Sequence, residues 1–193
     1  DLDLAAAKLD VPGFDWAKLA GRPGKASFRA LLGGGGITGI PSFAVEAGVF
    51  QAAGKVAFDP AGGAFRSLTL DRFALGASEF SGTAAYDADR QLAVTLRGEG
   101  LDATSFIARR PAGTPSLVLP PFTLDGTFDK MWLGSGAPVT GVRLALRRGA
   151  ADWQEFSLTA ALPPSGKQLS VKLAPTATGQ EMTLYAADAG AFL

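Results

Sequence analysis

Apolar and polar residues alternate with a period of two along much of this chain. In the clearest runs, residues 92–96, 142–146 and 169–173, leucine or valine takes every second position. This period is typical of a half-buried β-strand, because successive side chains point to opposite faces. We expect the apolar members of these and similar runs to face one apolar interior, and they are Phe43, Val45, Leu92, Val94, Leu96, Val142, Leu144, Leu146, Phe156, Leu158, Leu169, Val171 and Leu173.

Helical periodicity is nearly absent. The sequence predicts only short helical turns, over residues 104–109, over residues 15–20 and after Asp188. The 25 glycines and 12 prolines fall mostly between the alternating runs, where they favour turns. The predicted fold class is therefore all-β with very little helix, built as an antiparallel meander of strands in sequence order.

Two arrangements of such strands agree with the pattern. One is an open, twisted β-groove whose apolar face stays uncovered along its length. The other is a closed β-sandwich, in which two sheets bury their apolar faces against each other. Periodicity by itself favours the sandwich, because most amphipathic strands pack against a second layer.

Weak internal repeats support the meander. The sequence GKVAFD at residues 54–59 resembles GTAAYD at residues 82–87, which lies 28 positions later. The sequence LDRFALG at residues 70–76 resembles FDKMWLG at residues 128–134, 58 positions later. The shorter spacing suits two strands of about 5–10 residues with their turns, so each repeat is expected to be a hairpin unit.

A proline-rich segment divides the chain. Residues 111–121 are predicted to be a linker or insertion between a first β unit, residues 1–110, and a second β unit, residues 122–193. The chain opens with strand-like alternation over residues 1–4 and stops shortly after Asp188, which resembles a helix N-cap. We therefore expect an internal segment of a longer protein, with the second unit truncated at its C-terminal end.

The composition removes several chemistries. The chain has no cysteine and no histidine, which excludes thiolate catalysis, serine–histidine–aspartate triads and the commonest zinc sites. Its 18 basic and 18 acidic residues cancel, and they form no basic stripe that would indicate a nucleic-acid partner. No run approaches the roughly 18 apolar residues of a transmembrane helix.

The remaining candidate sites have structural explanations. The glycine run at residues 33–36 lacks the Gly-Lys-Ser/Thr sequence that grips a phosphate, and we interpret it as a hairpin tip. Asp71 and Asp129 take equivalent places in the longer repeat, which indicates a structural role because an active site is built once. We expect no enzymatic activity, no cofactor and no metal.

Three stretches resemble AsmA-like proteins, and within that group the long YhdP-type members. They are FRSLTLDRFALG at residues 65–76, continuing to RGEGLDA at residues 97–103, the W-x-K-x-x-G stretch within residues 11–21, and the D-x-G-x-x-L ending of residues 184–193. The similarity extends over nearly the whole chain, and none of its motifs is a catalytic signature.

The resemblance implies a segment of a protein in the periplasm of a Gram-negative bacterium, whose parent is anchored in the inner membrane by a helix outside this segment. It implies an open β-groove that carries phospholipids between the inner and outer membranes, with acyl chains as the partner of the thirteen apolar positions. The alternative is a structural or interaction β-sandwich module of an envelope or surface protein.

Overall fold

One large β-sheet dominates the protein. The structure is a computed structural model that describes residues 1–33, 36–60, 63–87, 90–108, 120–150, 152–176 and 179–188. Of these residues 70% are in strands and 2% in a helix. The elements are β1 (Leu2–Asp3), β2 (Leu9–Val11), β3 (Trp16–Lys18), β4 (Lys25–Gly33), β5 (Gly36–Ala47), β6 (Phe50–Phe58), β7 (Phe65–Leu75), β8 (Ser78–Tyr86), β9 (Leu92–Asp102), α1 (Thr104–Ile107), β10 (Phe122–Trp132), β11 (Val139–Arg148), β12 (Trp153–Leu162), β13 (Lys167–Thr176) and β14 (Gly179–Ala186).

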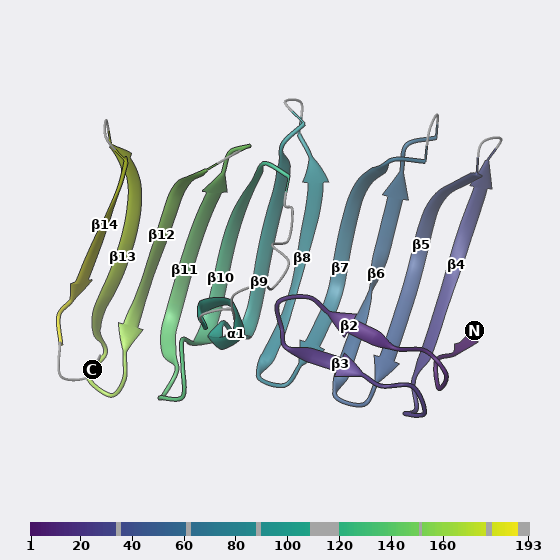
Figure 1. The fold of residues 1–193 in the computed structure, drawn as a ribbon, viewed down its shortest axis with the longest axis horizontal. Coiled ribbons are helices and arrows are strands. Elements are labelled where there is room, and N and C mark those ends of the chain that lie inside the picture. Colours follow the sequence, from purple (N-terminus) through teal and green to yellow (C-terminus); the bar gives the residue numbers. More distant parts are fainter. Residues whose placement is uncertain are drawn as a thin grey trace.

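The large sheet has twelve strands in the order β1-β4-β5-β6-β7-β8-β9-β10-β11-β12-β13-β14, and it does not close into a barrel (Figure 1). Among the described residues the only other sheet is the two-stranded β2–β3 hairpin. The all-β prediction is therefore confirmed, and of the two arrangements it is the open sheet that forms. No second large sheet of the described residues faces the first one.

The strands pair antiparallel throughout, with one exception. β9 and β10 run parallel, with ten residue pairs in constant register from Leu92–Phe122 to Asp102–Trp132. Parallel neighbours need a crossover connection, and here the chain passes through α1 between the two strands. The predicted linker, residues 111–121, lies in this connection and mostly outside the described residues. The two predicted β units thus join edge to edge in a single sheet.

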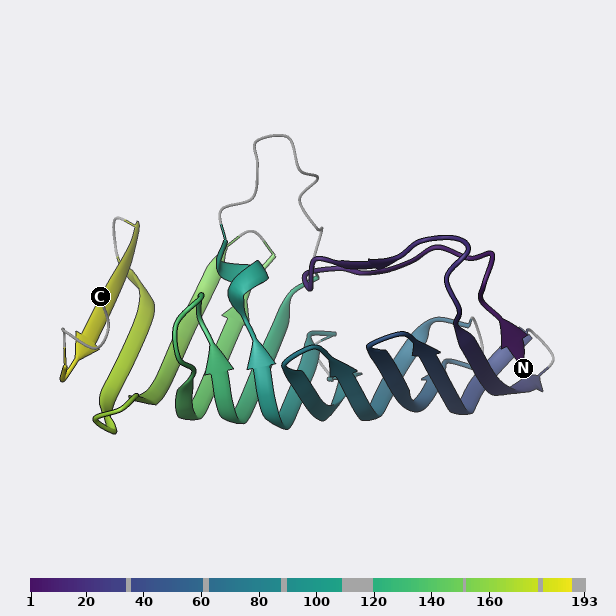
Figure 2. The same ribbon diagram turned by 90° about the horizontal axis from the view of Figure 1, so that it is seen from below.

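The β2–β3 hairpin and α1 lie over the same face of the sheet (Figure 2). We call this face the inner face and the opposite one the outer face. The hairpin crosses the region of β4–β8, and α1 lies beside it near β9–β11 (Figures 1 and 2). Because the hairpin pairs with no strand of the large sheet, we call residues 9–18 the strap.

The two ends of the strands differ. At the lower end in Figure 1, the β5–β6 and β7–β8 turns have two residues each, and Gly48 and Gly76 adopt φ of +62° and +60° there, a backbone conformation that favours glycine. The upper end carries the turns that follow Phe58 and Tyr86. The most buried side chains lie toward the lower end, where Met131, Val142 and Leu169 are at most 1% exposed. Burial of such a side chain stabilises the fold by about 1.5–3 kcal/mol.

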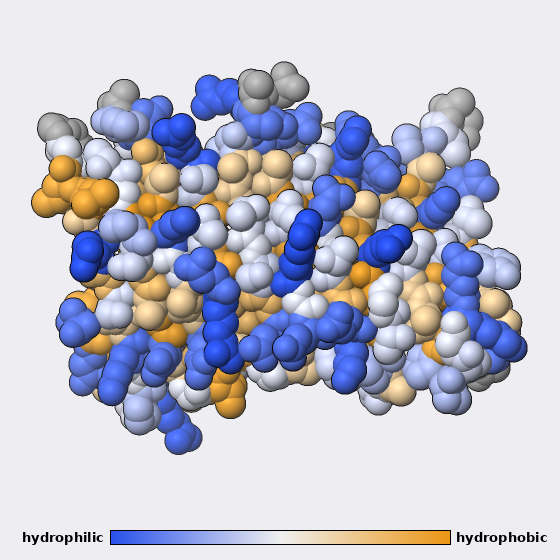
Figure 3. All heavy atoms as spheres, turned by 180° about the vertical axis from the view of Figure 1, so that it is seen from behind, coloured by the Kyte–Doolittle hydropathy of each residue, from blue (hydrophilic) through white to orange (hydrophobic). Residues whose placement is uncertain are grey.

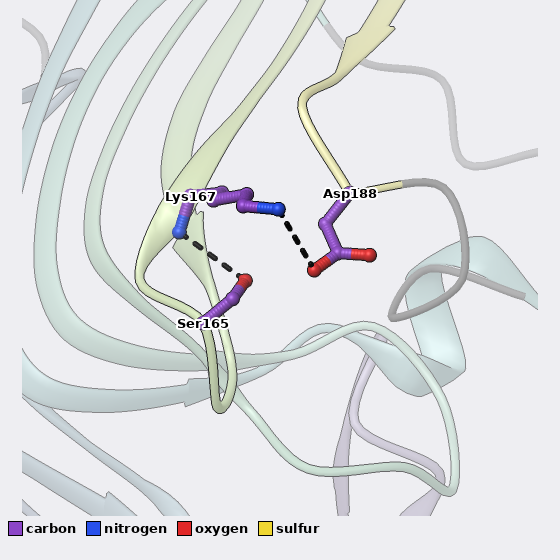
Figure 4. Close-up of polar contacts among 3 residues, drawn as sticks. All are labelled: Ser165, Lys167 and Asp188. Atoms are coloured by element: carbon purple, nitrogen blue, oxygen red, sulfur yellow. Dashed lines mark hydrogen bonds and ion pairs between the residues drawn. The ribbon is translucent and has the colours of Figure 1, made fainter.

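The short helical turns were predicted with mixed success. The prediction over residues 104–109 is confirmed for residues 104–107, which form α1, whereas residue 109 lies outside the described residues. The prediction over residues 15–20 is wrong, because Trp16, Ala17 and Lys18 form β3 and pair with β2. The predicted turn after Asp188 lies outside the described residues. Asp188 itself is held by Lys167 of the β12–β13 turn region, with 3.6 Å between Nζ and Oδ2 (Figure 4).

Candidate functional site

The strand register aligns inner-face side chains into rows that cross the sheet. The upper row joins ten strands, from β5 to β14, and consists of Ile40, Val56, Leu68, Ala84, Val94, Leu124, Leu146, Phe156, Leu173 and Met182. The middle row joins eleven strands and consists of Phe28, Phe43, Gly54, Leu70, Gly82, Leu96, Gly126, Leu144, Leu158, Val171 and Leu184. Neither row contains a polar side chain, so the inner face is a continuous apolar surface.

A lower row runs parallel to these two, from β5 to β11. It consists of Val45, Ala52, Phe73, Phe80, Gly98, Phe128 and Val142. Most side chains of the lower row are buried, namely Phe73, Phe80, Phe128 and Val142. The side chains of the upper row are half-buried on nine strands, and Met182 on the tenth strand is exposed. The inner face is therefore covered toward the lower end and open toward the upper end.

The register places all thirteen sequence-predicted residues on this face. Nine of them belong to the upper and middle rows. Val45, Val142 and Leu169 lie below these rows, and Leu92 lies above them, paired with Phe122 and Tyr86. Burial divides the set, because Val142, Leu158 and Leu169 are buried while the other ten are half-buried.

The middle row contains glycines that the sequence prediction missed. From β6 to β11 the row alternates strictly between glycine and leucine, and leucine side chains fill the space that the glycines leave. A Cβ atom added to Gly82 would lie 2.6 Å from Leu96 Cδ2 and 2.4 Å from the Thr95 carbonyl oxygen. The result is a level apolar surface. A signal existed in the sequence, since Gly54 and Gly82 open the shorter repeat.

The strap covers the inner face through aromatic contacts. The Phe14 ring lies 4.9 Å from the Phe73 ring and 5.1 Å from the Phe106 ring of α1, measured between centroids. Trp16 lies 5.2 Å from Phe50 in the same way. The strap therefore joins the lower row to α1 through packing of aromatic side chains.

A buried lysine fixes the base of the strap. Lys18 is only 4% exposed, and its Nζ donates hydrogen bonds to the carbonyl oxygens of Ala7 at 2.7 Å, Leu19 at 3.3 Å and Ala5 at 3.5 Å. Buried ammonium groups need such partners, because an unpaired charge is costly away from water. Sequence reasoning assigned Lys18 only to the W-x-K-x-x-G stretch and did not foresee this role.

Aromatic side chains mark the upper end of the inner face. The strand register places five aromatic residues just above the upper row, and we call this set the upper rim. Its members are Phe58, Phe65, Tyr86, Phe122 and Trp153. Phe65 and Tyr86 make an edge-on contact at 6.0 Å, as do Phe122 and Trp153 at 5.8 Å. Tyr86 and Trp153 remain 43% and 40% exposed.

The outer face has a different chemistry. Its rows are built from threonine, serine and charged residues, such as Arg97–Thr127–Arg143, and Figure 3 shows hydrophilic side chains spread over it with apolar patches between them. A shallow hollow of about 370 Å³ lies around Arg97, Asp125 and Arg143 of this face. The two faces thus separate apolar from polar side chains.

The described residues show no metal-binding cluster. They contain no group of three or more acidic residues that could hold a metal ion, and no buried side-chain nitrogen or oxygen atom among them lacks a hydrogen-bond partner. In the same part of the chain no helix is long and apolar enough to cross a membrane. Asp71 and Asp129, the repeated acidic residues, are exposed on β7 and β10.

The comparisons with known proteins name no family. No protein-family profile, no curated protein and no solved structure matches this chain. The functional interpretation therefore rests on the residues and the geometry described above.

Proposed function

We propose that the inner face binds the acyl chains of phospholipids, as one stretch of a groove along which lipids pass between two membranes. The observation that supports this proposal is the upper row, whose apolar side chains stay half-buried across nine neighbouring strands. Soluble proteins rarely leave an apolar patch of this extent uncovered unless it binds something.

The energetics suit an acyl ligand. Each methylene that leaves water for an apolar surface contributes about 0.8 kcal/mol. A continuous row of aliphatic side chains offers this gain at every position, so a chain that moves along it meets no polar trap. No residue needs to act as an acid, a base or a metal ligand, and we propose that this segment is not an enzyme.

The middle row extends from β4, next to one edge of the sheet, and both rows reach β14 at the other edge. Phe28 on β4 is 52% exposed and Met182 on β14 is 69% exposed. We propose that further strands of a longer parent protein extend these rows. In line with the resemblance to AsmA-like proteins, we place that parent in the periplasm of a Gram-negative bacterium, anchored in the inner membrane and leading to the outer membrane.

Photo-crosslinking tests the proposal directly. Benzoylphenylalanine is introduced at Leu124, in the upper row, or at Thr123, the neighbouring position on the outer face. The purified chain is mixed with phosphatidylcholine vesicles and irradiated, and mass spectrometry identifies adducts. We expect phospholipid adducts from position 124 and none from position 123.

A charged substitution in the upper row provides a second test of the proposal. Val94→Asp places a carboxylate beside Leu124, and we expect the adduct yield from position 124 to fall by about tenfold, the equivalent of about 1.4 kcal/mol. The outer-face substitution Thr95→Asp is the control and should leave the yield unchanged. Equal adducts from positions 123 and 124, or none from either, would instead favour a structural or interaction module.

A further inference from the structure

We infer that a lipid lies on the inner face in one fixed orientation, with its acyl chains parallel to the strands and its headgroup at the upper rim. This inference rests on the proposed function and adds the direction in which the lipid points. Two independent features carry it: the covered lower end and the chemistry of the upper rim.

Where the strap and α1 cover it, the lower end of the inner face leaves no outlet for a headgroup. Phe14 of the strap stacks over Phe73 and Phe80, with ring centroids 4.9 and 6.4 Å away, and contacts Phe106 of α1. All of these side chains are apolar, and Phe73 and Phe80 are at most 9% exposed. A phosphate placed among them would lose its hydration without gaining a hydrogen bond.

The upper rim has the opposite character. Tyr86 and Trp153 combine an apolar ring with a polar hydroxyl or indole N–H, and both are partly exposed. Side chains of this kind gather at the level of the headgroups in membrane proteins, because the ring packs on acyl chains while the polar tip stays hydrated. Arg148 lies next to the upper rim, because it pairs with Phe122 on one side and with Trp153 on the other.

Aromatic residues of the upper rim lie at a fixed sequence distance from glycines of the middle row. Phe58 lies four residues after Gly54, Tyr86 four residues after Gly82, and Phe122 four residues before Gly126 on a strand that runs the other way. The shorter sequence repeat thus encodes the glycine of the middle row, the aromatic residue of the rim and the aspartate of the turn above it. Three alternate strands, β6, β8 and β10, thus place an aromatic side chain at the same distance above the middle row.

The depth of the apolar face fits this orientation. From Leu92 at the rim to Gly98 in the lower row the strand advances six residues, which corresponds to about 20 Å at about 3.3 Å per residue. One leaflet of a bilayer has a hydrocarbon depth of about 15 Å, half of the whole core. Acyl chains that start at the rim therefore end near the strap.

Two photoactivatable phosphatidylcholines test the orientation on the unmodified chain. One carries a diazirine in the headgroup and the other at the end of an acyl chain. After irradiation in vesicles, the crosslinked residues are mapped by peptide mass spectrometry. We expect the headgroup probe to label the upper rim, around Phe65, Tyr86 and Trp153, and the tail probe to label the strap and the lower row around Phe14.

The outcomes separate the two proposals. If both probes label the same inner-face residues, or if the tail probe labels the rim and the headgroup probe the strap, the orientation is wrong while acyl binding stands. If neither probe labels the inner face more than the outer face, the orientation and the proposed function both fail.

Discussion

Leu96 lies across the backbone of Gly82 on the neighbouring strand, so that a Cβ atom at residue 82 would come within 2.6 Å of Leu96 Cδ2. The same added atom would lie 2.4 Å from the carbonyl oxygen of Thr95, which cannot move as a side chain can. Glycine at this position is therefore a packing requirement of the inner face.

Substitution of Gly82 tests this requirement. We expect Gly82→Val to lower the free energy of unfolding by about 1–3 kcal/mol, since the extra atoms must displace β9. The matched control is Gly179→Val on β14, where an added Cβ meets nothing within 4 Å and the change should stay within about 0.5 kcal/mol. Urea denaturation followed by circular dichroism gives both values, and equal losses would contradict the close packing.

A pair of identical substitutions tests whether the upper part of the inner face is open. Val142 is 1% exposed and Val94 is half-buried. We expect Val142→Asp to abolish the folded state, because an unpaired carboxylate is buried, while Val94→Asp costs only about 1–2 kcal/mol since its carboxylate reaches water. Thermal denaturation measures the difference. Complete unfolding of both variants would mean that Val94 is closed off as well.

The strap should open without unfolding the sheet. Phe14→Ala removes ring contacts to Phe73, Phe80 and Phe106, and we expect amide hydrogen exchange in β2 and β3 to rise by at least tenfold while β6–β9 stay protected. Leu19→Ala is the control, because Leu19 is 61% exposed and should change little. A rise in exchange throughout the sheet would show that the strap is part of the global core.

Lys18 gives a second, polar test of the strap. Lys18→Met keeps the length of the side chain but removes the donor for three backbone carbonyl groups, and we expect a loss of about 1–3 kcal/mol in local stability. Lys8→Met, at an exposed position of the same segment, should have no measurable effect. Proteolysis between residues 5 and 21 reports the difference, and equal cleavage of both variants would count against the buried lysine.

Strand alternation was the most reliable information in the sequence. It assigned the faces of Val94, Leu144 and Val171 as the register now has them, because a period of two leaves only one choice of face once a strand forms. The prediction of a helical turn at residues 15–20 failed because β3 has only three residues, too few to show a period of two. Its strand conformation depends on pairing with β2.

Other features depend on contacts between distant residues. Alternation cannot say whether an apolar face is covered, so the open sheet and the sandwich could not be separated by pattern alone. The parallel pairing of β9 with β10 depends on a crossover through α1, and a meander pattern predicts antiparallel neighbours everywhere. The buried ammonium group of Lys18 depends on three carbonyl groups whose positions are set by turns.

The order of the strands has a consequence for folding. From β5 to β14 each strand pairs only with its neighbours in the sequence, so stability is expected to add up from adjacent strand interfaces, as it does in repeat proteins. Among these interfaces from β5 to β14, only the β9–β10 interface requires a long chain closure before it forms, and closure entropy grows with the length of the connection. Because this closure is costly, the strands on each side of the β9–β10 interface are expected to pair before the interface itself forms.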